Sequence, residues 1–306
     1  MKITVIGSTN TDMVIKVPRL PKTGETVLGG KFYTAPGGKG ANQAVAAVRA
    51  GGDVTFVTRL GNDMFGEKIM KIFKDEDVKT EHIVIDKDVP SGIAQVIVGE
   101  NGENLIAVAS GANMNFSVYD VINAKQAILN SDILLMQLEI PLTTLEYAVK
   151  LAFDNHKRVI LNPAPAQPLS ISLLKMIGIL TPNEHEAEVL TGIKVEDENS
   201  AEDAGRILLS KGVGKVIITL GDKGAMVLDS SGSELISGFK THAVDTTAAG
   251  DIFNGALAVA LSENKNIFEA VKFANAAAAL SVTKLGAQPS APQRNDILRF
   301  MDESSL

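Results

Sequence analysis

One short segment of the sequence places an acid beside a possible anion site. Residues 245–251 read DTTAAGD and lead directly into an apolar-periodic run, which puts Asp251 in the first turn of a predicted helix. Free backbone N–H groups at a helix start, together with the helix dipole, attract anions. A carboxylate at that place could accept a proton from a nucleophile that attacks the anion. The alternative is an acid that only stabilises its own helix, and the segment alone does not decide between the two.

A glycine cluster forms a second candidate site. Residues 35–44 read APGGKGANQA and precede a predicted helix, and glycines let a backbone approach a ligand closely. The cluster has neither the Walker A spacing nor the dinucleotide fingerprint G-x-G-x-x-G, so it belongs to neither of those loop types. Lys39 and Asn42 lie near the helix start and favour ligand contact over a plain glycine turn.

Polar residues also follow predicted strands. Asn10 and Asp12 come just after the first strand, and Glu139 ends the apolar run 134–138. Open α/β sheets bind their ligands at the carboxyl ends of the strands. Asn10 and Asp12 could therefore hydrogen-bond vicinal hydroxyl groups of a ligand, although ordinary turn chemistry would also explain them.

Two further segments could serve a nucleotide and its metal ion. Asn183 and Glu186 stand three residues apart at a predicted helix start, so they share one side of its first turn. Oxygen ligands of this kind suit Mg²⁺, often through water, and the alternative is again a helix start stabilised by acids. Residues 219–224 (TLGDKG) combine a strand end with a glycine turn, which could cradle a nucleotide or simply make a hairpin.

Composition limits the classes of function. The 306 residues are 45% hydrophobic and 21% charged, as in ordinary globular proteins, and the net charge of −7 argues against a nucleic-acid or membrane partner. No run approaches the ~18 apolar residues of a membrane span, and the first residues predict a strand rather than a signal peptide. The absence of cysteine fits a cytoplasmic protein. The four histidines show no ligand spacing, which argues against a zinc site or a Ser-His-Asp hydrolase.

Strand and helix patterns alternate along most of the chain. The predicted strands are 3–6, 54–58, 133–137, 159–161, 177–180, 216–220 and 225–228. The predicted helices are 41–50, 65–74, 119–129, 142–153, 184–190, 201–211, 251–262, 267–283 and 295–301. This order predicts a single α/β domain over 1–306, with a mostly parallel sheet covered on both faces. Alternating segments around 12–34 and 91–108 predict antiparallel strands, which we expect to form a small β-sheet lid over the active-site edge.

The motifs, taken in order, resemble those of the ribokinase-like (PfkB) carbohydrate kinases. The matching segments are 37–44, 162–166, 181–184, 219–221, 245–251 and 286–290, so the resemblance covers essentially the whole chain. It implies a three-layer α/β/α domain and ATP-dependent phosphorylation of D-ribose at its 5-hydroxyl, with Mg²⁺ and an activating K⁺. The alternatives are a kinase for deoxyribose, a nucleoside or another furanose, and a non-catalytic sugar-binding regulator on the same fold.

The resemblance also implies a role for each residue of the site. Asp251 would be the base, and backbone N–H groups of Ala249, Gly250 and Asp251 would bind the transferred phosphoryl group. The sugar would contact Asn10, Asp12, Gly38, Lys39, Gly40, Ala41, Asn42, Glu139 and Asp251. ATP would contact Asn183, Thr219, Leu220, Gly221, Asp222, Lys223, Gly224, Gly250, Asp251 and Asn275. K⁺ would be held by Asp245, Thr247, Ser281, Lys284, Gly286 and Ser290, and Mg²⁺ by Glu186 through water.

The lid segments carry an expectation about partners. Their alternation leaves an exposed apolar face, formed by Val14, Val17, Ile93, Val96 and Val98, and such a face needs cover. The resemblance implies that two copies cover each other in a homodimer formed through the lid sheets.

Overall fold

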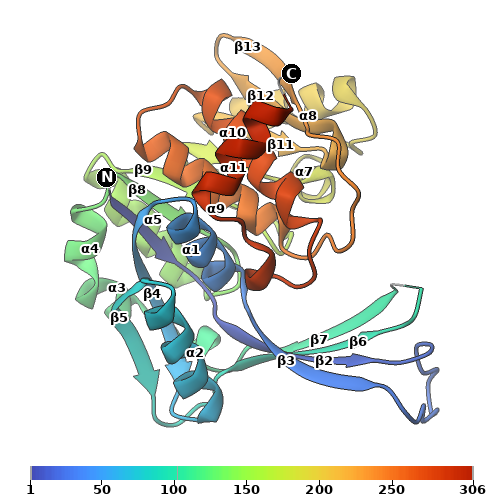
Figure 1. Cartoon of the computed structure of the whole chain (residues 1–306). Coiled ribbons are helices and arrows are strands. Elements are labelled where there is room, and N and C mark those ends of the chain that lie inside the picture. The colour runs from blue at the N-terminus through green and yellow to red at the C-terminus, as the bar shows by residue number, and fades with distance from the viewer. Residues whose placement is uncertain (1, 102, 305–306) are drawn as a thin grey trace.

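A nine-stranded sheet runs through the main body of the molecule (Figure 1). The computed structural model describes residues 2–101 and 103–304. The strands of this sheet are β1 (Lys2–Ile6), β4 (Asp53–Gly61), β5 (Lys79–Asp86), β8 (Ile133–Met136), β9 (Arg158–Leu161), β10 (Ile179–Leu180), β11 (Lys215–Thr219), β12 (Gly224–Asp229) and β13 (Gly232–Ser237). Their order is β13-β12-β11-β10-β9-β8-β1-β4-β5, and all neighbours are parallel except the antiparallel pairs that involve β12 and β13.

Helices cover both faces of the sheet, which confirms the predicted fold class. One face carries α1 (Lys39–Arg49), α2 (Met64–Asp75), α9 (Ala249–Ser262), α10 (Ile267–Ser281) and α11 (Arg294–Glu303). The other carries α3 (Val118–Asn123), α4 (Lys125–Leu129), α5 (Leu142–Asp154), α6 (Ile171–Leu174), α7 (Glu184–Thr191) and α8 (Glu198–Ser210). Three short 3₁₀ turns complete the described elements: η1 (Gly111–Asn115), η2 (Gly221–Lys223) and η3 (Gln288–Ser290). No helix within the described residues is both long and apolar enough to cross a membrane.

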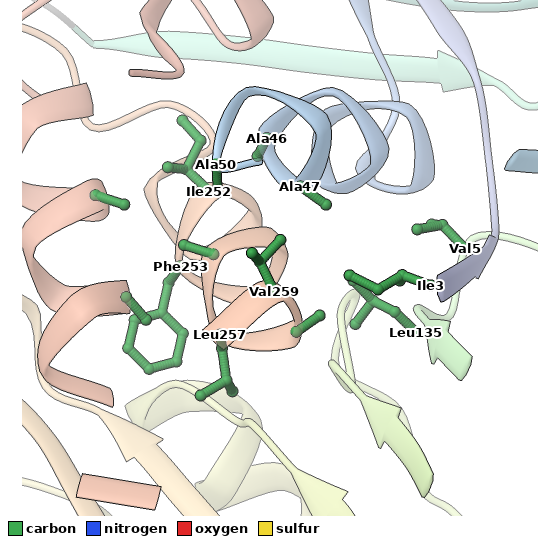
Figure 2. Close-up of a cluster of buried hydrophobic side chains, with 14 of the residues drawn as sticks. Ile3, Val5, Ala46, Ala47, Ala50, Leu135, Ile252, Phe253, Leu257 and Val259 are labelled. Atoms are coloured by element: carbon green, nitrogen blue, oxygen red, sulfur yellow. The ribbon is translucent and has the colours of Figure 1, made fainter. Parts of the chain in front are cut away.

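The core between the sheet and α1 and α9 decides where the segment 245–251 lies. Ile3 and Val5 of β1 point toward these helices, and Ile6 points to the opposite core, as the alternation of a strand requires (Figure 2). The two helices approach so closely that a Cβ at Gly255 would lie 2.7 Å from the carbonyl oxygen of Gln43. A glycine at that position therefore lets the start of α9 sit directly against the start of α1.

A separate four-stranded sheet projects from the body (Figure 1). Its strands are β2 (Asn10–Lys16), β3 (Lys31–Gly37), β6 (Gly92–Val98) and β7 (Asn104–Ala109), in the order β3-β2-β6-β7. We call this unit the lid sheet. The antiparallel pairing predicted within each segment is present, but the two segments join through a parallel pair, β2 with β6. The pair is parallel because β2 and β6 both leave the same edge of the body and run outward side by side. This pairing was not predicted from the sequence.

Several elements differ from the sequence predictions. The helix predicted over 119–129 is broken into α3 and α4 at Ala124 (φ −89°, ψ 5°). Strands β5 and β13 and the short helix α6 were not predicted. Both unpredicted strands lie at the edges of the large sheet and are partly exposed. The apolar run of β13 has only two residues, 235–236, whereas β5 carries the run 83–85, which the prediction did not use.

Candidate active site

Asp251 lies in the first turn of α9, and the start of α1 holds its carboxylate. Asn42 donates from Nδ2 to Oδ2 (2.9 Å), and Gln43 donates from Nε2 to Oδ1 (3.0 Å). Ala248, the residue before the helix, adopts the left-handed conformation (φ 61°), which turns the chain sharply into α9. Only 5% of Asp251 is exposed. The sequence prediction of an acid in this first turn is confirmed, and its two amide partners come from the glycine cluster.

The electrostatic surroundings of Asp251 combine burial with a nearby cation. Burial raises the pKa of Asp251, and the charge of Lys39 with the amide groups of Asn42 and Gln43 opposes that rise. In turn, the negative charge of Asp251 is the largest influence on Lys39 and raises the pKa of its ammonium group. Lys39 therefore stays protonated and faces the acid across the site.

Backbone donors at the start of α9 are available to an anion. Across residues 2–101 and 103–304, no acceptor pairs with the backbone N–H of Gly250 or Asp251, whereas Ala249 donates to the carbonyl oxygen of Thr246 (3.3 Å). A Cβ at Gly250 would meet no atom within 4 Å, so the space before the turn is open. The arrangement is an anion-binding helix start with a carboxylate beside it.

The sugar-side residues surround the approach to Asp251 from three elements. Gly38 has φ 88°, and a Cβ there would lie 2.7 Å from the backbone nitrogen of Asn10. The oxygen Oδ1 of Asn10 accepts from Nδ2 of Asn113 (2.8 Å), which leaves the Asn10 amide NH₂ free to donate to a ligand. Glu139 accepts from the Ser8 hydroxyl and from the backbone nitrogen of Lys39 (3.0 Å).

Asp12 has a different environment from Asp251. Burial and, secondly, the charge of Glu139 raise its pKa to about 6. Within the described part of the chain no hydrogen bond reaches its carboxylate, although a Cβ at Gly37 would lie 2.4 Å from both of its oxygens. Only a glycine at 37 leaves room for this acid.

The nucleotide-side residues form at the ends of β10 and β11. Asn183 caps α7 by accepting from the backbone nitrogen of Glu186 (2.8 Å), and Glu186 accepts in return from the backbone nitrogen of Asn183 (2.9 Å). A parallel bridge joins Asn183 to Thr219. Burial, the largest influence, raises the pKa of Glu186.

Glu186 lines the cleft beside Asn183 and could serve a divalent cation. Both of its oxygens already accept from Asn183, which suits a hold on Mg²⁺ through water rather than direct chelation. No cluster of three His, Asp or Glu side chains in the described chain could hold a metal ion by itself. Such an ion would therefore depend on phosphate oxygens for most of its ligands.

The six residues predicted for K⁺ stand in the loop before α9 and in the segment from the end of α10 to η3, and Asp245 ties these two segments together. Asp245 accepts from the backbone nitrogen of Gly286 (2.8 Å) and of Thr247 (2.9 Å). Burial acts to raise the pKa of Asp245, but these hydrogen bonds outweigh it and the pKa is lowered. The hydroxyls of Ser281 and Ser290 donate within their own turns, so their oxygens remain acceptors only. Carboxylate and carbonyl oxygens in two adjacent loops are a donor set that fits a monovalent cation.

A single cleft of about 830 Å³ joins these groups. The predicted residues that line it are Asn10, Asp12, Gly38, Lys39, Asn42, Glu139, Asn183, Glu186, Thr219, Asp245, Thr247, Ala249, Gly250, Asp251 and Gly286. Those outside its lining are Gly40, Ala41, Leu220, Gly221, Asp222, Lys223, Gly224, Asn275, Ser281, Lys284 and Ser290. Asn275 spends its amide donors on the carbonyl oxygens of Ile236 (3.0 Å) and Ser237 (3.3 Å) in β13. The structure therefore gives Asn275 a role in holding β13 against α10.

Sequence reasoning missed five polar residues that support the cleft: Gln43, Asn113, Asn162, Thr181 and Asn254. All are buried, and three of them also line the cleft: Asn162, Thr181 and Asn254. The signal available in the sequence was an amide or hydroxyl residue at a predicted strand end or helix start. Such a polar group, once buried, must find a hydrogen-bond partner. Nothing in the sequence shows which partner it finds.

The lid sheet corrects one expectation about its apolar face. Val14 and Val17 are each only 7% exposed and line the cleft, and Ile93, Val96 and Val98 are half-buried. The exposed apolar side chains lie instead in β3 and β7, where Phe32, Leu105 and Ile106 are 59%, 50% and 59% exposed. The outer strands of the lid therefore carry the uncovered apolar surface.

Comparison with known proteins decides the family. The model of the pfkB family carbohydrate kinases matches residues 1–294. The chain belongs to this family. A ribokinase of Haemophilus influenzae is 48% identical over 302 residues, covering 99% of both chains. The solved structure of an Arabidopsis thaliana ribokinase complexed with ribose and ATP is 34% identical, with a TM-score of 0.92 and 98% of each chain covered. A deoxyribokinase of Salmonella typhi is 34% identical, and the match covers 95% of the present chain and 96% of the deoxyribokinase.

Proposed function

We propose that this kinase transfers the γ-phosphoryl group of ATP to the 5-hydroxyl of D-ribose and produces ribose 5-phosphate and ADP. One observation carries the proposal: a buried carboxylate and free helix-start N–H groups lie in one cleft, between a set of hydroxyl-binding side chains and Asn183, Glu186 and Thr219. The similarity to ribokinases over nearly the whole chain supports ribose as the acceptor.

In the proposed reaction, Asp251 accepts the proton of the sugar 5-hydroxyl while the oxygen attacks the γ-phosphorus and ADP departs. The backbone N–H groups of Gly250 and Asp251 stabilise the charge of the transferred group, and that of Ala249 would join them by giving up its long bond to the carbonyl oxygen of Thr246 (3.3 Å). Phosphoryl transfer has a loose transition state, so positioning and charge stabilisation matter more than prior deprotonation of the alcohol. Lys39 places a permanent positive charge beside the reacting groups.

Two ions belong to the proposal. Mg²⁺ would enter with ATP and neutralise phosphate charge, and Glu186 would orient it through water. K⁺ would be held by oxygen atoms of the two loops joined by Asp245, with contributions from Thr247, Ser281, Lys284, Gly286 and Ser290. Because Asp245 lies six residues before Asp251 in the turn that leads to α9, a bound cation would order that turn.

The proposal extends to the assembly and the location. The exposed apolar side chains on the cleft-facing side of β3 and β7, which are Tyr33, Ile106 and Val108, support a homodimer in which two lid sheets cover each other. The sequence 1–306 would then act as one domain whose lid insertions, about 12–34 and 91–108, close the sugar side of the cleft. The proposed location is the cytoplasm, where ATP is available.

A kinase for deoxyribose is the second candidate, since a deoxyribokinase is among the relatives. An assay that couples ADP release to NADH oxidation, run with ribose, deoxyribose, fructose and adenosine, distinguishes the two. We expect the highest kcat/KM with ribose. A higher value with any other acceptor would reassign the sugar, and no ADP release with all four would favour a sugar-binding regulator.

A further inference from the structure

Gln43 is fully buried and joins Asp251 to the ends of two strands. Its Nε2 donates to Oδ1 of Asp251 (3.0 Å) and to Oδ1 of Asn162 (3.1 Å), which follows β9. Its Oε1 accepts from Nε2 of Gln137 (2.5 Å), which follows β8. Every polar atom of the Gln43 side chain is therefore engaged, and none reaches the cleft.

The orientation of the Gln43 amide is determined by its neighbours. A reversed amide would turn Oε1 toward the carboxylate of Asp251 and would lose both hydrogen bonds that Nε2 makes. Asn162 accepts from Nε2 and so selects the orientation in which Gln43 donates to the acid. Gln137 donates to Oε1 in that orientation, and its own Oε1 has no partner among the described residues. Asn162 is oriented in turn, because its Nδ2 donates to the carbonyl oxygen of Thr181 (3.1 Å).

The place of Gln137 depends on a close packing with β1. A Cβ at Gly7 would lie 2.1 Å from Oε1 of Gln137, so a glycine is needed there for the side chain to reach Gln43. The ends of β8 and β9 thus each contribute one amide to the chain that ends at Asp251, and the end of β1 contributes the glycine that leaves room for it.

Asn42, the neighbour of Gln43, shows the contrast between the two amides. Asn42 also donates to Asp251, but it lines the cleft and its buried Oδ1 has no protein partner. Asn42 is therefore placed to contact both the acid and the sugar. Gln43 does not line the cleft, and Asp251 is its one partner among the reacting groups, so its effect on the reaction must pass through Asp251.

We propose that Gln43 is a positioning residue for the proposed phosphoryl transfer: with Gln137 and Asn162 fixing its amide, it holds the Asp251 carboxylate in the orientation that meets the sugar hydroxyl. The inference rests on the proposed role of Asp251, and it does not depend on which sugar is the acceptor. It predicts that loss of the Gln43 amide lowers kcat and leaves sugar binding nearly unchanged.

The charged groups that face Asp251 define how this loss changes the pH dependence. Lys39 lies on α1 with Gln43, Glu139 follows β8, and Glu186 lies on α7. These three stay in place when Gln43 is replaced. Because a hydrogen bond to the ionised form lowers the pKa of a carboxylate, its removal raises the pKa of Asp251 and moves the acid limb of kcat to higher pH.

The test compares Gln43→Met with the wild-type enzyme. Methionine has nearly the same length and no amide, so we expect kcat to fall roughly 10-fold to 100-fold through misplacement of the carboxylate. Ribose affinity, measured by calorimetry, should stay close to the wild-type value. Combining Gln43→Met with Asp251→Asn should cost nothing beyond Asp251→Asn alone, because the two residues act through one carboxylate.

Two further variants serve as controls. Gln137→Met removes the neighbour of Gln43 without touching Asp251, so it should show the same signature with a smaller fall in kcat, even if Gln43→Met fails to fold. Thr4→Val removes the hydrogen bond from the Thr4 hydroxyl, in the middle of β1, to the carbonyl oxygen of Ala127 and should leave kcat unchanged. Unchanged kcat in Gln43→Met, a sugar affinity that falls as much as kcat, or an additive double variant would overturn the inference. A wild-type enzyme that prefers another sugar would overturn only the acceptor assignment, and the same variants would then be compared on that sugar.

Discussion

Asp251 on the floor of the cleft and Asp12 in the lid sheet face the same space but are held in different ways. Both oxygens of Asp251 accept amide hydrogen bonds from α1, and Lys39 lies nearby. Asp12 accepts no hydrogen bond within the described residues, and its pKa is raised to about 6 by burial and by Glu139. The floor carboxylate has its partners before a ligand arrives, whereas the lid carboxylate lacks them.

The difference follows from what each region is packed against. The floor belongs to the core between α1, α9 and the large sheet, where every side chain has fixed neighbours (Figure 2). The lid sheet meets the body where its strands enter and leave it (Figure 1), and Lys68 of α2 also donates to the hydroxyl of Thr34 in β3 (2.8 Å). Chemistry that needs an accurately placed group therefore lies on the floor, and ligand hydroxyl groups would supply the missing partners of the lid.

The largest effect should come from the floor. Asp251→Asn keeps the size of the side chain and removes the base, so kcat should fall by about 10² to 10⁴. Sugar affinity should change far less, because Asn10, Asn42 and Glu139 remain. Steady-state kinetics and calorimetry on the same preparation measure both quantities. A variant that keeps more than a tenth of the wild-type kcat would remove Asp251 from its proposed role.

The next largest effect, on sugar affinity, should come from η1, which follows β7 where the lid sheet joins the body and which we call the hinge. Asn113 in η1 bonds both to Thr9 and to Oδ1 of Asn10, so it sets which atoms of the Asn10 amide face the sugar. Asn113→Ala should raise the KM for sugar by roughly 10-fold, since it leaves buried polar groups unpaired. Asn115→Ala is the matched control, because Asn115 belongs to the same turn and bonds to Asp86 instead. Equal KM values for the two variants would contradict a role for the hinge.

The lid carboxylate should make sugar binding depend on pH. A folded pKa of about 6, raised from 3.8, means that Asp12 is protonated below about pH 6 and becomes an acceptor for hydroxyl groups above it. Sugar affinity should therefore improve by roughly 10-fold as the pH rises from 5 to 7. Calorimetric titrations across this range measure it, and Asp12→Asn should show a flat profile. A pH dependence that survives in Asp12→Asn would assign it to another group.

Replacement of K⁺ tests the loop that leads into the floor. Activity in a buffer with only Na⁺ or a bulky organic cation should be lower than activity in K⁺. We expect a difference of roughly 5-fold, which corresponds to a weak coupling between the cation site and the catalytic site. The Asp245→Asn variant should be equally active in the K⁺ and Na⁺ buffers, because the substitution removes the charge that ties Thr247 to Gly286. Equal activity of the wild type in the different buffers would show that the cation assignment is wrong.

The smallest effect on the chemistry should come from the outer lid. Tyr33, Val14, Val96 and Ile106 are in register across the four strands and form one row on the cleft-facing side. Ile106→Asp should separate a dimer into monomers in light scattering, with little change in the environment of Asp251. Leu105→Asp, on the opposite side of the same strand, is the control. Dimers that persist in Ile106→Asp, or a monomeric wild type, would exclude this interface.

Local patterns in the sequence were enough for most of the fold and for part of the site. Apolar strands alternating with helices predicted the parallel α/β body, and the small-residue turn before an apolar run predicted an acid in the first turn of α9. These features depend on neighbours within a few residues, so the sequence carries them directly. The edge strand β13 was missed because an exposed edge needs no long apolar run, and β5 was missed although it carries the short apolar run 83–85.

The partners of each functional side chain were decided by the tertiary structure alone. Asn42 and Gln43 meet Asp251 across 209 and 208 residues of sequence, and they do so because Gly255 lets α1 and α9 touch. The parallel joining of β2 to β6, the raised pKa of Asp12 and the bond from Asn113 to Asn10 likewise depend on which segments lie side by side. By itself, the sequence determined which residues could do chemistry and at which strand and helix ends they stand. Which of them hold one another in place followed only from packing, because a buried polar group takes its partner from whatever part of the chain the core brings within hydrogen-bond distance.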